Sequence, residues 1–337
     1  MNRLADFRLK LGDVVQAPLE VSQLPGVQYS HPHGDPGLFG PGSISWRVGE
    51  DWPSALVGGM SGLILGTLHP LVLAGTLDHS IFRTDPIGRL ARTASFVMAT
   101  AFGSTEVALG VVDYVNRLHS RISGTAPNGV EYSATDPGLA VWTHVTIYGG
   151  FLEGHLRYAP NPISGPEVDR YWDEVARVPE MLGATGVPRS RYEVDDYFRR
   201  VRPELSASRD ALDSARWVLD GGKGDTPTVR DSAKALVDAW QQVLPPALQI
   251  DRRFLTPASA AAVRVAYAIF ARTAVDLLPQ WGREMLQLRR SRLAEPLTRA
   301  YFTSLRLAVP TLPRALRQAQ ARASAPPRSS EGEAKAS

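Results

Sequence analysis

The chain has 337 residues, of which 44% are hydrophobic, and its formal net charge is +3. This composition supplies enough apolar material for a packed core, and the scattered basic residues argue against a nucleic-acid partner. The absence of cysteine excludes disulfides, iron–sulfur clusters, a cysteine nucleophile and thiolate-ligated haem. Any metal chemistry must therefore use His, Asp, Glu or Tyr.

Residues 1–34 are predicted to form an N-terminal extension. The opening stretch Met1–Lys10 mixes both charge signs and has no apolar run before a small-residue cleavage site. We therefore expect no signal peptide and a cytoplasmic location. The end of the extension is dense in Gly and Pro, and we interpret His31 and His33 there as parts of a solvated loop rather than a metal pair.

The stretch Ala55–Leu77 contains no charged residue and is long enough to cross a bilayer. It also contains several glycines, and the pair His69-Pro70 interrupts it. Proline removes a backbone donor and disfavours helix at the preceding residue. We favour two buried core helices meeting at Pro70, and we do not expect membrane association.

Capping residues, prolines at first helical positions and terminal glycines predict helices along most of the chain. The expected starts are Pro86, Ser104, Asp136 and Ser164, with ends at Gly124 (closing a helix over Thr105–Ser123) and Gly183. Apolar periodicity predicts further helices over 192–201, 206–219, 229–244, 257–278 and 295–307. One short extended piece is expected over 130–132. The predicted fold is all-α, a single large multi-helix bundle over 35–310 with a disordered tail over 311–337.

His119 lies in line with an apolar stripe, because helical steps back from it reach Val115, Val112, Val111 and Ala108. A core imidazole must hydrogen-bond or ligate something, since leaving it unpaired is costly. From spacing alone, a core histidine bonded to a backbone carbonyl is favoured over a metal ligand.

His144, Tyr148, Phe151 and His155 follow one another at offsets that place them on one helix face. The two histidines are about 16 Å apart along such a helix, so they cannot bind one ion. There is no Glu-x-x-His pair and no His-Glu-x-x-His motif, which argues against di-iron carboxylate and zinc-protease sites.

Arg89 and Thr93 are one helical turn apart, and Phe96 and Val97 continue on that side. An arginine along an apolar face needs an anionic partner, for which a buried carboxylate and a haem propionate are equally suitable. Gly-x-Ser-x-Gly is absent, so a serine hydrolase is not expected.

Several short motifs, taken in order, give the sequence a family resemblance. They are Gly37–Ser43 with Trp46–Val48, Leu68-His69-Pro70, Asp78-His79-Ser80, Arg89-x-x-x-Thr93, His119, Tyr132–Pro137, Trp142-Thr143-His144 and Phe151-Leu152. From about Asp35 to Trp281, the sequence resembles the catalytic-domain family shared by rubber oxygenase (latex clearing protein) and the oxygenase MpaB.

The resemblance implies an all-helical fold that encloses a haem b pocket and a haem-dependent oxygenase or related oxidoreductase. His119 matches the iron-binding histidine, and Arg89 and Thr93 match the preceding motif. The family implies dioxygen or peroxide as oxidant and an apolar substrate, such as an isoprenoid or lipid-like molecule. We expect His69, His79 and Arg92 on the distal side; His144 would line or orient the site.

Two departures limit what carries over. Arg92 stands where the rubber enzymes have a lysine that can cap the iron, and a guanidinium stays protonated and cannot ligate. Those enzymes also use an upstream glutamate, whereas Ala55–Leu77 has no acid and Asp78 is the nearest. Polyisoprene cleavage is therefore not expected, and unlike those secreted enzymes this chain shows no export signal.

Two alternatives stay open at this point. The protein could be a non-catalytic helical carrier of haem or of an apolar ligand, or an accessory protein. It could also be a non-haem metal oxygenase that uses His69, His79 or His144.

Overall fold

The computed structural model describes residues 29–84, 86–220, 257–291, 294–308 and 314–326. The chain is almost entirely α-helical, with one small sheet, which confirms the predicted all-α fold. The helices are α2 (Ile44–Glu50), α3 (Trp52–Gly66), α4 (Pro70–His79), α5 (Pro86–Phe102), α6 (Thr105–His119), α7 (Pro137–Tyr158), α8 (Pro166–Val175), α9 (Arg177–Met181), α10 (Arg191–Val201), α11 (Arg209–Leu219), α13 (Pro257–Leu277), α14 (Gln280–Met285), α15 (Ala294–Ala308) and α16 (Arg314–Ser324).

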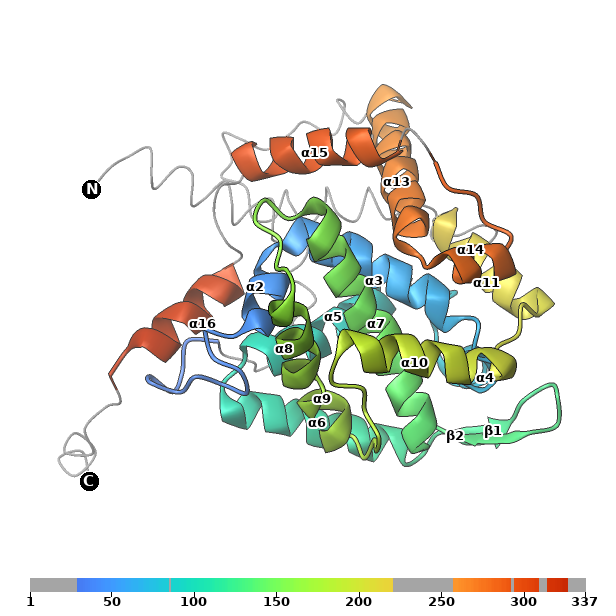
Figure 1. The fold of residues 1–337 in the computed structure, drawn as a ribbon, viewed down its shortest axis with the longest axis horizontal. Helices are drawn as coiled ribbons and strands as arrows, with labels where there is room; N and C mark the ends of the chain where they lie inside the picture. Colours follow the sequence, from blue (N-terminus) through green and yellow to red (C-terminus); the bar gives the residue numbers. More distant parts are fainter. Residues whose placement is uncertain (1–28, 85, 221–256, 292–293, 309–313, 327–337) are drawn as a thin grey trace.

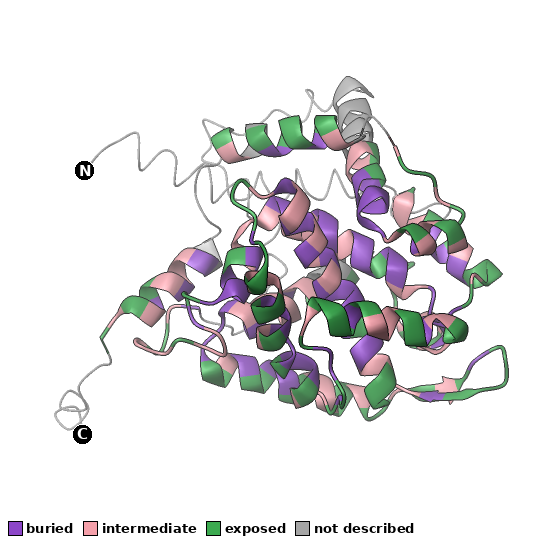
Figure 2. Ribbon diagram, viewed as in Figure 1, coloured by how far each residue is buried: buried purple, intermediate pink, exposed green. Residues whose placement is uncertain are grey.

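Helices α3 and α7 pack along each other at the centre of the molecule (Figure 1), and buried residues concentrate on both of them (Figure 2). Glycines permit this close approach, because a Cβ on Gly58 would overlap the carbonyl oxygen of Gly150, and one on Gly62 would overlap that of Thr146. Helix α7 begins as predicted, with the Asp136 carboxylate accepting the amide of residue 138 at 2.7 Å.

Helix α3 ends at Gly66, and α4 begins at Pro70 after a bend of 104°. The predicted break at Pro70 is confirmed, and each helix contributes buried residues, as expected for core helices. No single helix among the described residues is both long and apolar enough to cross a membrane. The bent pair α3–α4 meets that test only jointly, by length and composition.

Helices α5 and α6 form an antiparallel hairpin whose turn lies at Gly103 and Ser104. The Ser104 hydroxyl accepts the amide of Val107 at 3.3 Å, so it caps α6 as predicted. Helix α6 ends at His119, four residues before the expected Ser123, because the chain there enters strand β1 (Ser123–Thr125). That strand pairs antiparallel with β2 (Glu131–Ser133), of which the sequence indicated only the second.

The predicted helix ending at Gly183 is instead two helices, α8 and α9. Pro179 explains the break, because it offers no backbone N–H to the carbonyl of Val175 one turn earlier. The Ser164–Glu167 pair forms half of a capping box, in which the Glu167 carboxylate accepts the amide of Ser164 at 3.1 Å. Helices α10, α11, α13 and α15 confirm four expected segments, and the fifth, over 229–244, lies outside the described residues.

The disordered tail expected over 311–337 is wrong for Arg314–Ser324, which form α16. Leu316 and Ala319 bury against Trp46 and Phe102. The arginine- and alanine-rich composition concealed this helix, because its buried face combines only Leu316 and Ala319 with a buried arginine, Arg322.

Candidate active site

Arg89 on α5 and His119 on α6 come together across the helical hairpin. Arg89 precedes Ser104 by 15 residues (104 − 89), and His119 follows Ser104 by 15 (119 − 104). In an antiparallel hairpin, residues equidistant from the turn lie at the same level along the two helices. Burial, and secondly the Arg89 charge, lower the pKa of His119. The imidazole is therefore neutral at neutral pH, with a nitrogen lone pair available.

The Arg89 guanidinium donates to the hydroxyls of Ser80, at 3.2 Å, and Thr93. Within the described residues its partners are hydroxyls rather than carboxylates. The side chain keeps accessible surface, yet the surrounding protein and the nearby cation Arg92 lower the pKa of its guanidinium. The cations Arg89 and Arg92 could bind an anionic group, and the neutral imidazole of His119 could bind a metal ion next to it. Sequence reasoning missed the role of Ser80, although it stands in the Asp78-His79-Ser80 motif.

The hairpin also offers apolar surface next to this pair. Phe96 and Val97 on α5 and Val115 on α6 are half-buried, whereas the expected stripe positions Val112, Val111 and Ala108 are buried. None of the core clusters formed by the described residues includes α6 or residues 89–97. This part of the hairpin is therefore amphipathic without being packed into those clusters.

His79 lies at the same end of the molecule as Arg89, because it is the last residue of α4 and Ser80 follows it. Its ring is exposed, and Nε2 is 3.2 Å from the carbonyl oxygen of Ser123, just beyond the end of α6. His79 is therefore placed at the rim of the Arg89–His119 region.

His69 lies at the opposite end of α4, about 15 Å from His79 along the helix, so the two histidines cannot share one ion. Its Nε2 is 3.9 Å from Glu204, and burial lowers its pKa to about 4. With Tyr197 and Arg200 it lines a pocket of about 220 Å³, smaller than the roughly 300–1,000 Å³ typical of small-molecule sites.

His144 lies inside the core on α7, with its ring centroid 4.5 Å from that of Tyr148 and 6.2 Å from that of Trp172. Neither ring nitrogen has a hydrogen-bond partner within the described residues, and burial lowers its pKa to about 3. His155, three turns later, differs because its Nε2 accepts the amide of Ile163 at 3.2 Å. An unpaired, fully buried imidazole is unusual and available to a bound group.

All seven histidines fall in the described part of the chain. There, no three His, Asp or Glu side chains approach closely enough to hold a metal ion. The non-haem alternative based on His69, His79 and His144 therefore lacks a ligand set among these residues.

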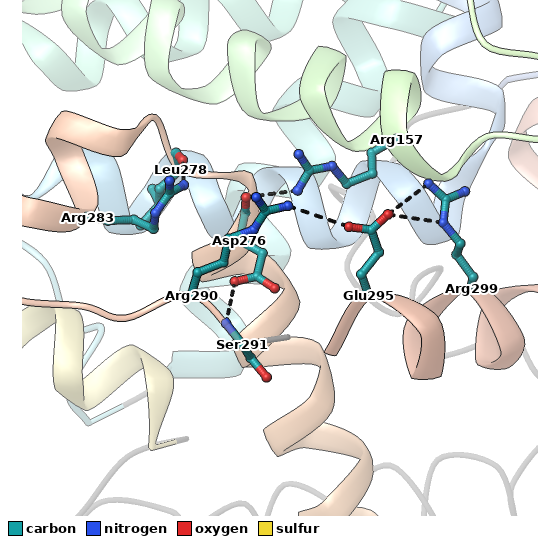
Figure 3. A network of polar contacts seen from close by, with 8 residues as sticks. All are labelled: Arg157, Asp276, Leu278, Arg283, Arg290, Ser291, Glu295 and Arg299. Atoms are coloured by element: carbon teal, nitrogen blue, oxygen red, sulfur yellow. Dashed lines mark hydrogen bonds and ion pairs between the residues drawn. The ribbon is translucent and has the colours of Figure 1, made fainter. Parts of the chain in front are cut away.

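A separate polar cluster ties α13, α14 and α15 to the end of α7 (Figure 3). The buried Asp276 carboxylate accepts the amide of Ser291 at 2.9 Å, and its backbone carbonyl accepts from Arg157 at 3.0 Å. Burial raises the pKa of Asp276, against the opposing charges of Arg290, Arg157 and Arg283. The contacts of Arg157, Arg283 and Ser291 in this cluster involve backbone atoms, so we interpret it as structural.

The family described as ER-bound oxygenase mpaB/B'/Rubber oxygenase, catalytic domain, matches residues 46–309. This interval covers most of the chain, includes every site residue discussed above and confirms the family inferred from the motifs. No individual curated protein and no solved structure matches the chain.

Proposed function

Because the chain belongs to the mpaB/rubber oxygenase catalytic-domain family, a family of oxygenases, we propose that it is a haem-b-dependent oxygenase or related oxidoreductase. His119 would bind the iron, and the substrate would be an apolar, isoprenoid- or lipid-like small molecule. One observation carries the proposal: His119 and Arg89 lie at the same level of a helical hairpin, beside the half-buried apolar residues Phe96 and Val115, and burial and the Arg89 charge lower the pKa of the imidazole. We propose a cytoplasmic location.

The donor set of the hairpin fits haem. Haem iron needs only one protein imidazole on its proximal side, so a three-residue metal cluster is not required. The lowered pKa of His119 keeps that imidazole unprotonated. The half-buried Phe96 and Val115 would contact the flat, apolar macrocycle. Bound haem would supply the activation of dioxygen or peroxide.

The charged residues have separate proposed roles. Arg89, oriented by the Thr93 hydroxyl, would pair with a haem propionate. Arg92 cannot ligate iron, so its contribution would be positive charge near the reacting centre. His79 would contribute to the distal side from the rim of the Arg89–His119 region.

The two remaining histidines are placed differently. His144, with both ring nitrogens unpaired, would line the interior of the site. His69 lines a separate pocket, and a distal role for it stays part of the proposal.

The visible spectrum of the purified protein tests this proposal. We expect a Soret band in the parent that His119→Ala abolishes and added imidazole restores. His155→Ala is the control, because that histidine is buried and is bonded to the Ile163 amide, and it should keep the band. A parent protein that stays colourless after expression with ample haem overturns the proposal.

A carrier of haem or of an apolar ligand would also show a Soret band. The distinguishing measurement is consumption of dioxygen or peroxide in the presence of apolar candidate substrates. Turnover supports the oxygenase, and haem binding without turnover across such a panel supports the carrier.

A further inference from the structure

Arg322 on α16 is fully buried and binds backbone carbonyls from two distant parts of the chain. Its Nε donates to Asp35 at 2.9 Å, and Nη1 donates to Tyr29 at 3.0 Å. The same side chain also reaches the α5–α6 turn, where Nη1 donates to Phe102 at 3.0 Å and Nη2 to Gly103 at 3.1 Å. One side chain thus joins the N-terminal segment, the C-terminal helix and the turn of the hairpin.

The Asp35 carboxylate binds the residue that follows the same turn. It accepts the amide of Thr105 at 3.0 Å and the Thr105 hydroxyl at 2.9 Å, and it also accepts the amide of Gly37 at 2.7 Å. Gly37 has φ +74°, and a Cβ there would overlap the carbonyl oxygen of Gly103. The N-terminal segment is therefore seated directly on the backbone of the turn.

The position of this turn sets the register of the hairpin. A slip of one residue along α6 would rotate its side chains by about 100° and shift them by about 1.5 Å. Such a slip would remove His119 from its place opposite Arg89, because the two are equally far from Ser104. The register of the α5–α6 hairpin therefore determines the geometry of the candidate active site.

We infer that Arg322 and Asp35 form a clamp that fixes the register of the α5–α6 hairpin and so positions His119 opposite Arg89. Both clamp residues lie outside residues 46–309, the interval that matches the family's catalytic domain. Arg322 is a positioning residue, because its contacts are with backbone carbonyls far from His119. Only the consequence for haem rests on the proposed function; the geometric part stands without it.

The chain contains no cysteine, so spin labels can be placed at two introduced cysteines without background. Tyr114 on α6 and Tyr192 on α10 are 53% and 75% exposed, and Tyr114→Cys with Tyr192→Cys would report the position of α6. The distance distribution between the labels would be measured by pulsed electron paramagnetic resonance in the full chain, below its melting temperature.

We expect one narrow distribution in the doubly labelled parent and a shifted or broadened one in Arg322→Met. Arg322→Lys should be intermediate, because lysine keeps the charge but has fewer donors. Arg209→Met removes an arginine whose side chain is 93% exposed, and it should match the parent. A parental distribution in folded Arg322→Met overturns the inference. If Arg322→Met does not fold, Asp35→Asn takes its place, and a parental distance distribution in that variant overturns the inference.

Haem titration is the second measurement. If His119 binds haem, Arg322→Met should weaken haem binding about tenfold or more, because small displacements of positioned groups have large effects. Unchanged haem affinity in folded Arg322→Met would contradict the clamp's role at the site. A parent that binds no haem overturns the proposed function instead, and the label distances alone then decide the clamp.

Discussion

Arg89 and His119 oppose each other across the α5–α6 hairpin, and the arginine charge adds to burial in lowering the pKa of the histidine. The two residues are far apart in the sequence, and the antiparallel packing of α5 and α6 brings them to the same level. The pairing creates a neutral imidazole beside a cation, which suits a metal-bound group that carries carboxylates.

Replacing Arg89 should raise the pKa of His119. In haem-free Arg89→Met, the loss of the positive charge favours the protonated imidazole, so the ring should titrate at a higher pH than in the parent. Burial is the larger cause and persists, so the pKa should stay below its ordinary value. Histidine resonances followed by NMR against pH measure this shift. Arg117→Met, which removes an exposed arginine two residues away, is the control, and equal shifts in both variants would contradict the pairing.

The packing of α3 against α7 should depend on its glycines. Gly150→Ala would force a methyl group into the Gly58 carbonyl and should lower the free energy of unfolding by about 3 kcal/mol. Gly110→Ala is the matched control, because nothing lies within 4 Å of a Cβ there; it should raise stability by about 0.5–1 kcal/mol. Urea denaturation measures both. An unchanged free energy of unfolding in Gly150→Ala would show that α3 and α7 can separate slightly without loss of stability.

His144 should make the haem-free protein sensitive to acid. Its pKa is about 3 in the folded chain and near 6.5 when unfolded, so the unfolded state takes up the proton first as pH falls. Stability is thus full above about pH 6.5 and declines below it, by up to about 1.4 kcal/mol per pH unit.

His144→Phe should remove this contribution to the acid sensitivity. Because it also removes two unpaired buried nitrogens, it should stabilise the haem-free protein by about 1 kcal/mol at pH 7. Denaturation curves at pH 5, 6 and 7.5 measure both effects. His155→Phe is the contrast, since it loses the bond from the Ile163 amide and should be destabilised by about 1 kcal/mol. A less stable His144→Phe at pH 7 would indicate that the imidazole has a partner.

Arg306 should anchor α15 to the centre of the molecule. It binds Asp51 through two bonds of 2.9 and 2.7 Å and the Tyr158 carbonyl at 3.0 Å. Both charged side chains are mostly buried, so Arg306→Met should cost about 3 kcal/mol in unfolding free energy. Arg299→Met breaks an exposed pair with Glu295 on the same helix and should cost less than about 1 kcal/mol. Similar losses in thermal or chemical denaturation would contradict a special role for Arg306.

The sequence by itself determined the features that depend on neighbours within a turn or two. The Ser104 and Asp136 caps and the break at Pro70 follow from local hydrogen bonding and proline chemistry. The order of the motifs was also sufficient to identify the family. Spacing alone favoured a core histidine at position 119, and it was the family resemblance that selected His119 as the candidate ligand.

Only the tertiary structure decided which of these residues meet. In the folded chain the Arg89 charge acts on His119, and His69 and His79 lie at opposite ends of α4. The residues Arg314–Ser324, predicted to be disordered, form α16. These outcomes depend on contacts between distant segments, such as the bond from Arg322 to Asp35, which are 287 residues apart. Local propensity carries no information about such contacts, because their free energy arises from burial and from hydrogen bonds that exist only once the helices have packed.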